Sequence, residues 1–256
     1  MGMFDGFKVN LAGNKALRAH QAAQQAAKKG NDSQMEKQYA LAKVLYQEAL
    51  DMGCKMPKVY MSYAILLMRD GELERARDLM LQVQKFPGLA DVEKKQLHIN
   101  YAVCQWKLGN IDKAIELLKN AEAKGKSGTI YMMLGHLLLE KAAQTGDYTE
   151  AAPYVQEAYE YDEDDAEAID LMGQLHFARG EYTEAKAMFN KALEKDALQG
   201  WSVVYLAKIA KAEGDAAAEK AFMERAVQCH FHLMSPISKK DARQYAKSLG
   251  IAVEEV

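Results

Sequence analysis

The sequence predicts an all-α fold, a solenoid built from stacked helical hairpins, and three observations support this. The segment Gly-Asp-Tyr-Thr-Glu-Ala at 146–151 returns as Gly-Glu-Tyr-Thr-Glu-Ala at 180–185 and, in weaker form, at 214–219. The step between copies is 34 residues both times, a period typical of helical repeat arrays. Small residues seven positions apart also recur along the chain, which places them on one helix face where two helices can approach closely.

Composition narrows the class of protein. The 256 residues are 49% hydrophobic and 27% charged, with four prolines, as in a folded helical protein. A net charge of -3 provides no basic field for nucleic acid. Cys54, Cys104 and Cys229 are too few and too widely spaced for a disulfide framework, which favours a reducing compartment. Because no stretch has the length and apolarity of a membrane span or a signal peptide, we expect a cytoplasmic protein without direct membrane insertion.

The N-terminal part of the chain has the least regular pattern. Residues 1–13 mix aromatic residues with glycine and asparagine without helical spacing, so we expect a non-helical arm. Asn14 is a candidate N-cap for the first helix of a hairpin over 14–57. Ser33 and Glu36 have the spacing of a capping box, which predicts the start of the second helix.

Five further hairpins share one pattern. Each has a small residue in its first helix and then a turn with glycine. In three of them the second helix has two alanines seven positions apart, and in the other two Val83 and Glu219 occupy one of these positions. Glycine supplies the left-handed conformation that ends the first helix, and the polar residue after it favours the start of the second. The small residues of the first helices are Ala64, Ala102, Gly135, Gly173 and Ala207. The expected hairpins span 58–90, 91–126, 127–164, 165–198 and 199–230.

The C-terminal part departs from the repeat. Glu219 stands where the second helix of the last hairpin should carry a small residue, so we expect that hairpin to pack loosely or to end the array. Ser238 and Asp241 again have the spacing of a capping box. We interpret 231–256 as a capping helix and a tail, because a solenoid needs a polar outer face at its end.

This combination of positions resembles the tetratricopeptide repeat (TPR) family, whose hairpins read small residue, Gly-Asp/Glu-Tyr, Ala, aromatic, Ala. The best match lies between Gly173 and Ala192, with Tyr182 and Phe189 at the aromatic positions. The resemblance covers residues 58–230, and 14–57 more distantly. It implies a right-handed α-solenoid that serves as a protein–protein interaction scaffold.

In that family, one side of the first helices lines a concave groove where peptides bind. The corresponding positions here lie three before, one after and four after each small residue, and we call them the inner-face positions. In the first three hairpins with the pattern they are almost all apolar, including methionines and a tryptophan, a composition suited to holding an apolar or amphipathic segment of a partner protein. Lys208 and Lys211 would steer an acidic end of that segment. The predicted ligand-binding residues are Met61, Ile65, Met68, Ile99, Val103, Trp106, Met132, His136, Leu139, Gln174, Phe177, Lys208 and Lys211.

Two alternatives stay open. The N-terminal arm or a second copy of the chain could cover the apolar inner face, which would make the protein a self-capped solenoid or a structural homo-oligomer. Cys229, His230 and His232 could form a metal or enzymatic site, since thiolate and imidazole are zinc ligands. We expect no cofactor and no catalysis, because the sequence has no phosphate-binding loop, nucleophile elbow or zinc-protease motif.

Overall fold

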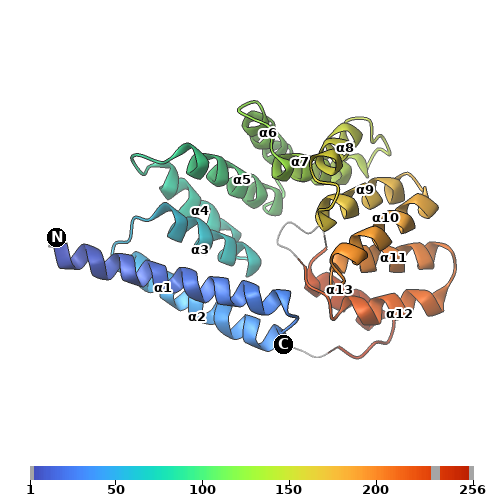
Figure 1. Cartoon of the computed structure of the whole chain (residues 1–256), viewed down its shortest axis with the longest axis horizontal. Coiled ribbons are helices and arrows are strands. Elements are labelled where there is room, and N and C mark those ends of the chain that lie inside the picture. The colour runs from blue at the N-terminus through green and yellow to red at the C-terminus, as the bar shows by residue number, and fades with distance from the viewer. Residues whose placement is uncertain (1–2, 232–236, 254–256) are drawn as a thin grey trace. The chain divides into compact units, whose positions relative to one another are not determined.

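The computed structural model describes residues 3–231 and 237–253. Within these residues the named elements are all α-helices, and none is a β-strand (Figure 1). The predicted all-α helical repeat fold is therefore confirmed. The helices are α1 Met3–Lys28, α2 Asp32–Asp51, α3 Pro57–Arg69, α4 Leu73–Gln84, α5 Asp91–Lys107, α6 Ile111–Glu122, α7 Gly128–Ala142, α8 Ala151–Tyr161, α9 Ala166–Ala178, α10 Tyr182–Lys195, α11 Gly200–Ala212, α12 Ala216–Ala226 and α13 Lys239–Ser248.

The chain divides into two compact units, Met1–Leu117 and Leu118–Val256, and the division falls within α6. In the first unit, α1 packs against α2 and α3 against α4, while α5 contacts both α3 and α4. In the second unit, the hairpins are α7–α8, α9–α10 and α11–α12, and α9 contacts both α7 and α11. The first helices of consecutive hairpins therefore lie next to each other, which brings their inner-face positions together within each unit.

The expected N-terminal arm is wrong, because α1 begins at Met3 and runs without a break through residues 3–13. Gly13 lies inside this helix and faces α3. A Cβ atom at Gly13 would lie 2.9 Å from Cγ2 of Val59. The glycine therefore permits the close approach of two helices, and this tertiary packing overrides the lack of helical spacing that suggested an arm.

Most of the predicted helix ends are confirmed. Gly180 and Gly214 have φ of 77° and 80°, the left-handed conformation that other residues rarely adopt. The capping box of Ser238 is present at the start of α13. The second helix is capped by Asn31 instead of Ser33, since the Asn31 side chain accepts a backbone hydrogen bond at 3.0 Å.

The small residues of the first helices make room for large ones on neighbouring helices. A Cβ atom at Gly173 would lie 2.7 Å from the ring of Phe189, which is fully buried. That ring stacks on Tyr205 with a centroid separation of 5.3 Å and an interplanar angle of 13°. Glycine on α9, phenylalanine on α10 and tyrosine on α11 thus form one packed layer in the second unit.

Glu219 corrects the expectation of a loosely packed last hairpin. Its side chain is buried, and its carboxylate accepts a hydrogen bond of 2.6 Å from the Tyr245 hydroxyl on α13. Burial, together with this carboxylate, raises the pKa of Tyr245. The residue that departs from the repeat pattern therefore anchors the capping helix, because a glutamate can reach a partner that an alanine cannot.

The Tyr245→Phe variant should lose about 1–3 kcal/mol of stability, because the buried Glu219 carboxylate loses its hydroxyl donor. Urea unfolding measures the loss, and hydrogen exchange across α13 should accelerate. Tyr161→Phe is the matched control, since Tyr161 is 61% exposed and its change should stay within about 0.5 kcal/mol. Equal stability of the two variants would contradict the anchoring role of Glu219.

Candidate functional site

The predicted ligand-binding residues lie on α3 and α5 in the first unit and on α7, α9 and α11 in the second. The structure buries six of the thirteen and leaves six half-buried, with Lys211 exposed. The buried ones are Met61, Met68, Ile99, Val103, Leu139 and Gln174. The half-buried ones are Ile65, Trp106, Met132, His136, Phe177 and Lys208. Packed neighbours within the chain therefore cover about half of the predicted ligand-binding residues.

In the first unit, Trp106 at the end of α5 and Ile65 on α3 keep part of their surface open. The ammonium group of Lys107 lies 4.9 Å from the centroid of the Trp106 ring, a cation–π contact that holds the cation at the edge of an aromatic surface. Val103, one turn before the tryptophan on α5, is buried. This part of the inner face thus combines a buried apolar base with an accessible indole ring.

In the second unit, polar side chains connect three consecutive first helices. The carboxylate of Asp170 on α9 is fully buried and accepts hydrogen bonds from the Ser202 hydroxyl on α11 and, at 2.6 Å, from the Gln174 amide. The Gln174 side chain also interacts with His136 on α7. This polar row fixes the side chains of α7, α9 and α11 relative to one another, because each member supplies a partner to the next.

The polar row contains two titratable groups with opposite shifts. Burial raises the pKa of Asp170 to about 7, although the hydrogen bonds from Ser202 and Gln174 favour the charged form. Burial also lowers the pKa of His136 to about 4, although its interaction with the Gln174 side chain favours the charged form. In both cases the interior disfavours the charged form, and desolvation is the larger effect.

Aromatic residues and a cation border the polar row. The rings of His136 and Trp201 meet edge to face at 5.0 Å, and those of Phe177 and Tyr205 at 5.1 Å. The Lys208 ammonium lies 4.5 Å from the Tyr205 centroid, and burial lowers the pKa of Lys208. The indole nitrogen of Trp201 is buried and has no hydrogen-bond partner among the described residues.

The sequence analysis missed Trp201, Ser202 and Tyr205, although they contact His136, Asp170 and Phe177 respectively. The inner-face positions include only three places in each first helix, and none of the three missed residues is among them. Trp201 lies six positions before Ala207, which on a helix returns to nearly the same side as the inner-face positions. That spacing could have identified the tryptophan. The contacts of Ser202 and Tyr205 depend on α9, so no pattern within α11 identifies them.

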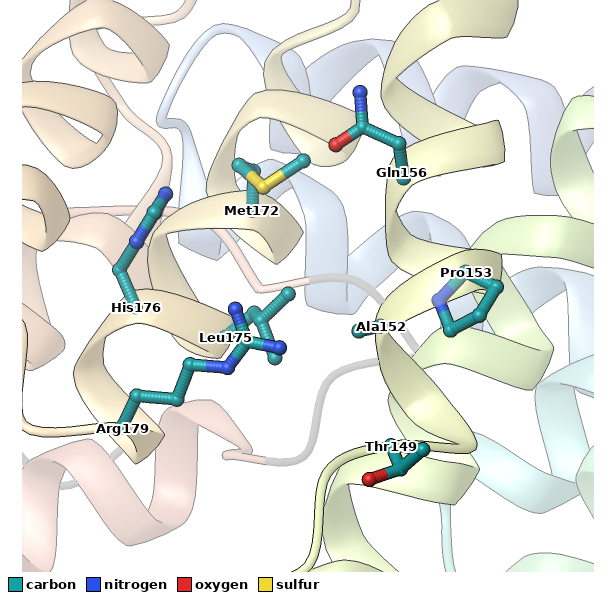
Figure 2. Close-up of a pocket in the computed structure, with 8 residues that line it drawn as sticks. All are labelled: Thr149, Ala152, Pro153, Gln156, Met172, Leu175, His176 and Arg179. Carbon is teal, nitrogen blue, oxygen red and sulfur yellow. The ribbon is translucent and has the colours of Figure 1, made fainter.

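A separate pocket lies between the start of α8 and the end of α9 (Figure 2). Its volume is about 540 Å³. Figure 2 shows the two rows of side chains facing each other, with Gln156 and Met172 at one end and Thr149 and Arg179 at the other. The lining residues are Thr149, Ala152, Pro153, Gln156, Met172, Leu175, His176 and Arg179. Nothing in the sequence pattern predicted this pocket.

The residues of the alternative metal site are engaged elsewhere. The Cys229 thiol is buried, which raises its pKa, and donates to a backbone carbonyl at 3.4 Å. Nε2 of His230 lies 2.8 Å from the Asp196 carboxylate. His232 is outside the described residues. Within the part of the chain that the structure describes, no group of three or more His, Cys, Asp or Glu side chains is placed to hold a metal ion.

Comparisons with known proteins agree on the fold. Two family models, both described as tetratricopeptide repeat, match residues 102–168 and 142–204. No curated protein sequence is significantly similar to this one. Among the described residues, none of the helices combines the length and the apolarity that a membrane span requires.

Three solved structures illustrate the similarity. PilW, a widely conserved type IV pilus biogenesis factor, has a TM-score of 0.57 and 17% identity over 82% of this chain and 91% of its own. TTC0263, a thermophilic TPR protein of Thermus thermophilus, has a TM-score of 0.61 and 19% identity over 77% of this chain and 100% of its own. The APC/C hetero-tetramer Cut9–Hcn1 has a TM-score of 0.61 and 15% identity over 95% of this chain and 46% of the matched chain. At these identities the likeness concerns the fold alone.

Proposed function

We propose that this chain, which matches tetratricopeptide repeat family models over residues 102–204, is a scaffold that binds an apolar or amphipathic segment of a partner protein on its inner faces. Repeat arrays of this kind differ in what they bind, because each repeat adds surface and none adds a catalytic group. One structural neighbour, Cut9, occurs in a hetero-tetramer with Hcn1, which supports assembly with other proteins as a use of this fold.

One observation carries the proposal. Side chains of α7, α9 and α11 contact one another through the row from His136 to Ser202, and neighbouring groups keep part of their surface open. Consecutive repeats can therefore present one continuous surface in the second unit. Such a surface is rigid before the ligand arrives, which lowers the entropic cost of binding.

Within this proposal, the half-buried and exposed residues among the predicted ligand-binding residues contact the ligand, and the buried ones support them. Trp106 and Phe177 are the aromatic anchors, since large aromatic residues dominate the energetics of protein interfaces. Lys208 and Lys211 attract an acidic end of the bound segment. The proposal includes no cofactor and no catalytic step.

Trp106→Asp tests the proposal. Peptides selected from a library on the wild-type chain should bind this variant about ten-fold more weakly or worse, because the anchor is lost and a charge faces an apolar ligand. Val92→Asp is the matched control, because Val92 also lies on α5 and is 74% exposed, but it lies in the first turn, 14 residues before Trp106 and beyond the predicted ligand-binding residues. Binding constants from fluorescence anisotropy decide the outcome. Unchanged affinity of every selected peptide for Trp106→Asp would contradict the proposal.

Self-association is a second candidate function, and one observation favours it. Among the described residues, five of the seven exposed large hydrophobic side chains lie in α1, in α2 or just after α2. These five are Phe7, Leu11, Leu41, Val44 and Met52. Exposed apolar side chains gathered on one helical hairpin can mark an interface without naming its partner. Light scattering at several protein concentrations would show a mass that rises with concentration if these side chains join two copies.

We also propose the cytoplasm as the compartment. The thiols of Cys54, Cys104 and Cys229 are all free and buried, and unpaired cysteines are usual where thiols are kept reduced.

A further inference from the structure

We propose that the pocket between α8 and α9 is a second binding site, for an extended protein segment that carries an acidic side chain near an apolar one. The pocket is independent of the inner face. On a helical projection of α9, Met172, His176 and Arg179 point roughly opposite to Asp170, Gln174 and Phe177, at about 100° per residue. A ligand in the pocket therefore leaves the inner face free.

The dimensions of the pocket fit a short extended segment. Its lining runs along α9 from Met172 to Arg179, which is about 10 Å at the helical rise of about 1.5 Å per residue. An extended chain covers that length with about three residues. Leu175 and Met172 are buried and form an apolar floor with Ala152 of α8. The floor suits an apolar side chain.

Charge distinguishes one end of the pocket from the other. Arg179 is exposed, and its guanidinium makes no hydrogen bond or ion pair with the described residues. Figure 2 shows this side chain extending from the end of α9 with its guanidinium directed toward α8. None of the eight lining residues is acidic. A guanidinium with all its donors unused, at the edge of an apolar floor, is complementary to a carboxylate.

His176 does not compete for that carboxylate. Its Nδ1 lies 2.6 Å from the carboxylate of Glu181, and because a carboxylate only accepts, Nδ1 must carry a proton. The ring is therefore held in place, and Arg179 is the cation that remains for the ligand. Since Met172 and Arg179 lie at opposite ends, the ligand should place its apolar residue and its acidic residue about two positions apart.

A displayed library of internal heptapeptides, which have no free termini, tests this site. Selection on the wild-type chain should enrich peptides with an acidic residue near an apolar one. A selected peptide should bind Arg179→Glu about ten-fold more weakly, because a charge-assisted hydrogen bond is replaced by repulsion. Its affinity should also fall as the NaCl concentration rises from about 50 mM to about 500 mM.

Two control variants assign the result to the pocket. Lys220→Glu makes the same charge change at an exposed lysine of α12 and should leave binding unchanged. Trp106→Asp should also leave it unchanged, which separates this site from the proposed inner-face site. Arg179→Glu should fold normally because its side chain has no partner to lose, and circular dichroism checks this. Equal affinity for Arg179→Glu and wild type, or selected peptides without acidic residues, would show that the proposal is wrong.

Discussion

The Phe189→Ala variant is expected to lose about 3–5 kcal/mol of its free energy of unfolding. Phe189 is fully buried, and its ring occupies the space that Gly173 leaves on α9. The same ring stacks on Tyr205 of α11. Removing it leaves a cavity between three helices that cannot close, because the glycine has no side chain to move into the gap.

Urea unfolding of Phe189→Ala and of the wild type measures this loss of stability. Tyr161→Ala is the control, because Tyr161 is 61% exposed and its truncation should change stability by about 0.5 kcal/mol or less. A loss below about 1 kcal/mol for Phe189→Ala would mean that the layer of Gly173, Phe189 and Tyr205 does not hold the second unit together.

Asp170→Asn is expected to stabilise the protein at pH 8 by up to about 4 kcal/mol, with the gain vanishing near pH 4. Burial raises the pKa of Asp170 from its ordinary 3.8 to about 7. The folded chain therefore holds this proton more tightly than the unfolded chain, so stability is fully present below pH 3.8 and is lost as pH rises to about 7. A rise of this size corresponds to about 4 kcal/mol. Asparagine does not ionise, so the variant avoids the loss.

His136 gives this experiment a second readout. Its pKa is lowered from 6.5 to about 4, so the folded chain loses stability as pH falls through that range. In the wild type this loss opposes the gain from Asp170 over nearly the same range. Asp170→Asn removes the opposing contribution, and its stability should therefore fall steeply from pH 6.5 to pH 4 where that of the wild type stays nearly level.

The groups around Asp170 support a raised pKa for its carboxyl group. Ser202 and Gln174 donate hydrogen bonds to it, and Glu167 and Tyr205 are the neighbouring titratable groups, neither of which supplies a positive charge. Urea unfolding at pH 4.5, 6 and 8 measures the difference between variant and wild type. Asp164→Asn is the control at an exposed aspartate bonded to Lys195, where little change is expected. A difference that is the same at all three pH values would contradict a raised pKa for Asp170.

The fold could be predicted because its signals are local and repeated. The turn glycines, the capping residues and the small residues seven positions apart each act within one hairpin, and their recurrence at 34 residues multiplies the evidence. Gly13 is a position where local sequence signals give the wrong prediction. A glycine in the sequence suggests a chain break, whereas in the structure it allows α1 to approach Val59 on α3, and that depends on a neighbour distant in sequence.

The candidate sites were harder to predict, because they also depend on neighbours that are distant in sequence. The helix face that carries His136, Gln174 and Phe177 follows from the 3.6-residue period, but their burial depends on how closely successive first helices pack. In the sequence, Glu219 only departs from the repeat pattern. The structure shows that it accepts a hydrogen bond from Tyr245 of α13. The pocket with Arg179 has no sequence signature, because its two walls come from different hairpins.

The sequence by itself determined the class of fold, the repeat and the ends of most helices, because backbone conformation and helical periodicity depend on residues close together in the chain. Only the tertiary structure decided which inner-face residues are covered, that Asp170 is buried among Ser202 and Gln174, and that an unpaired arginine borders a pocket. The physical reason is that burial, and with it the cost of a charge or the freedom of a side chain to bind, is set by contacts between separate helices.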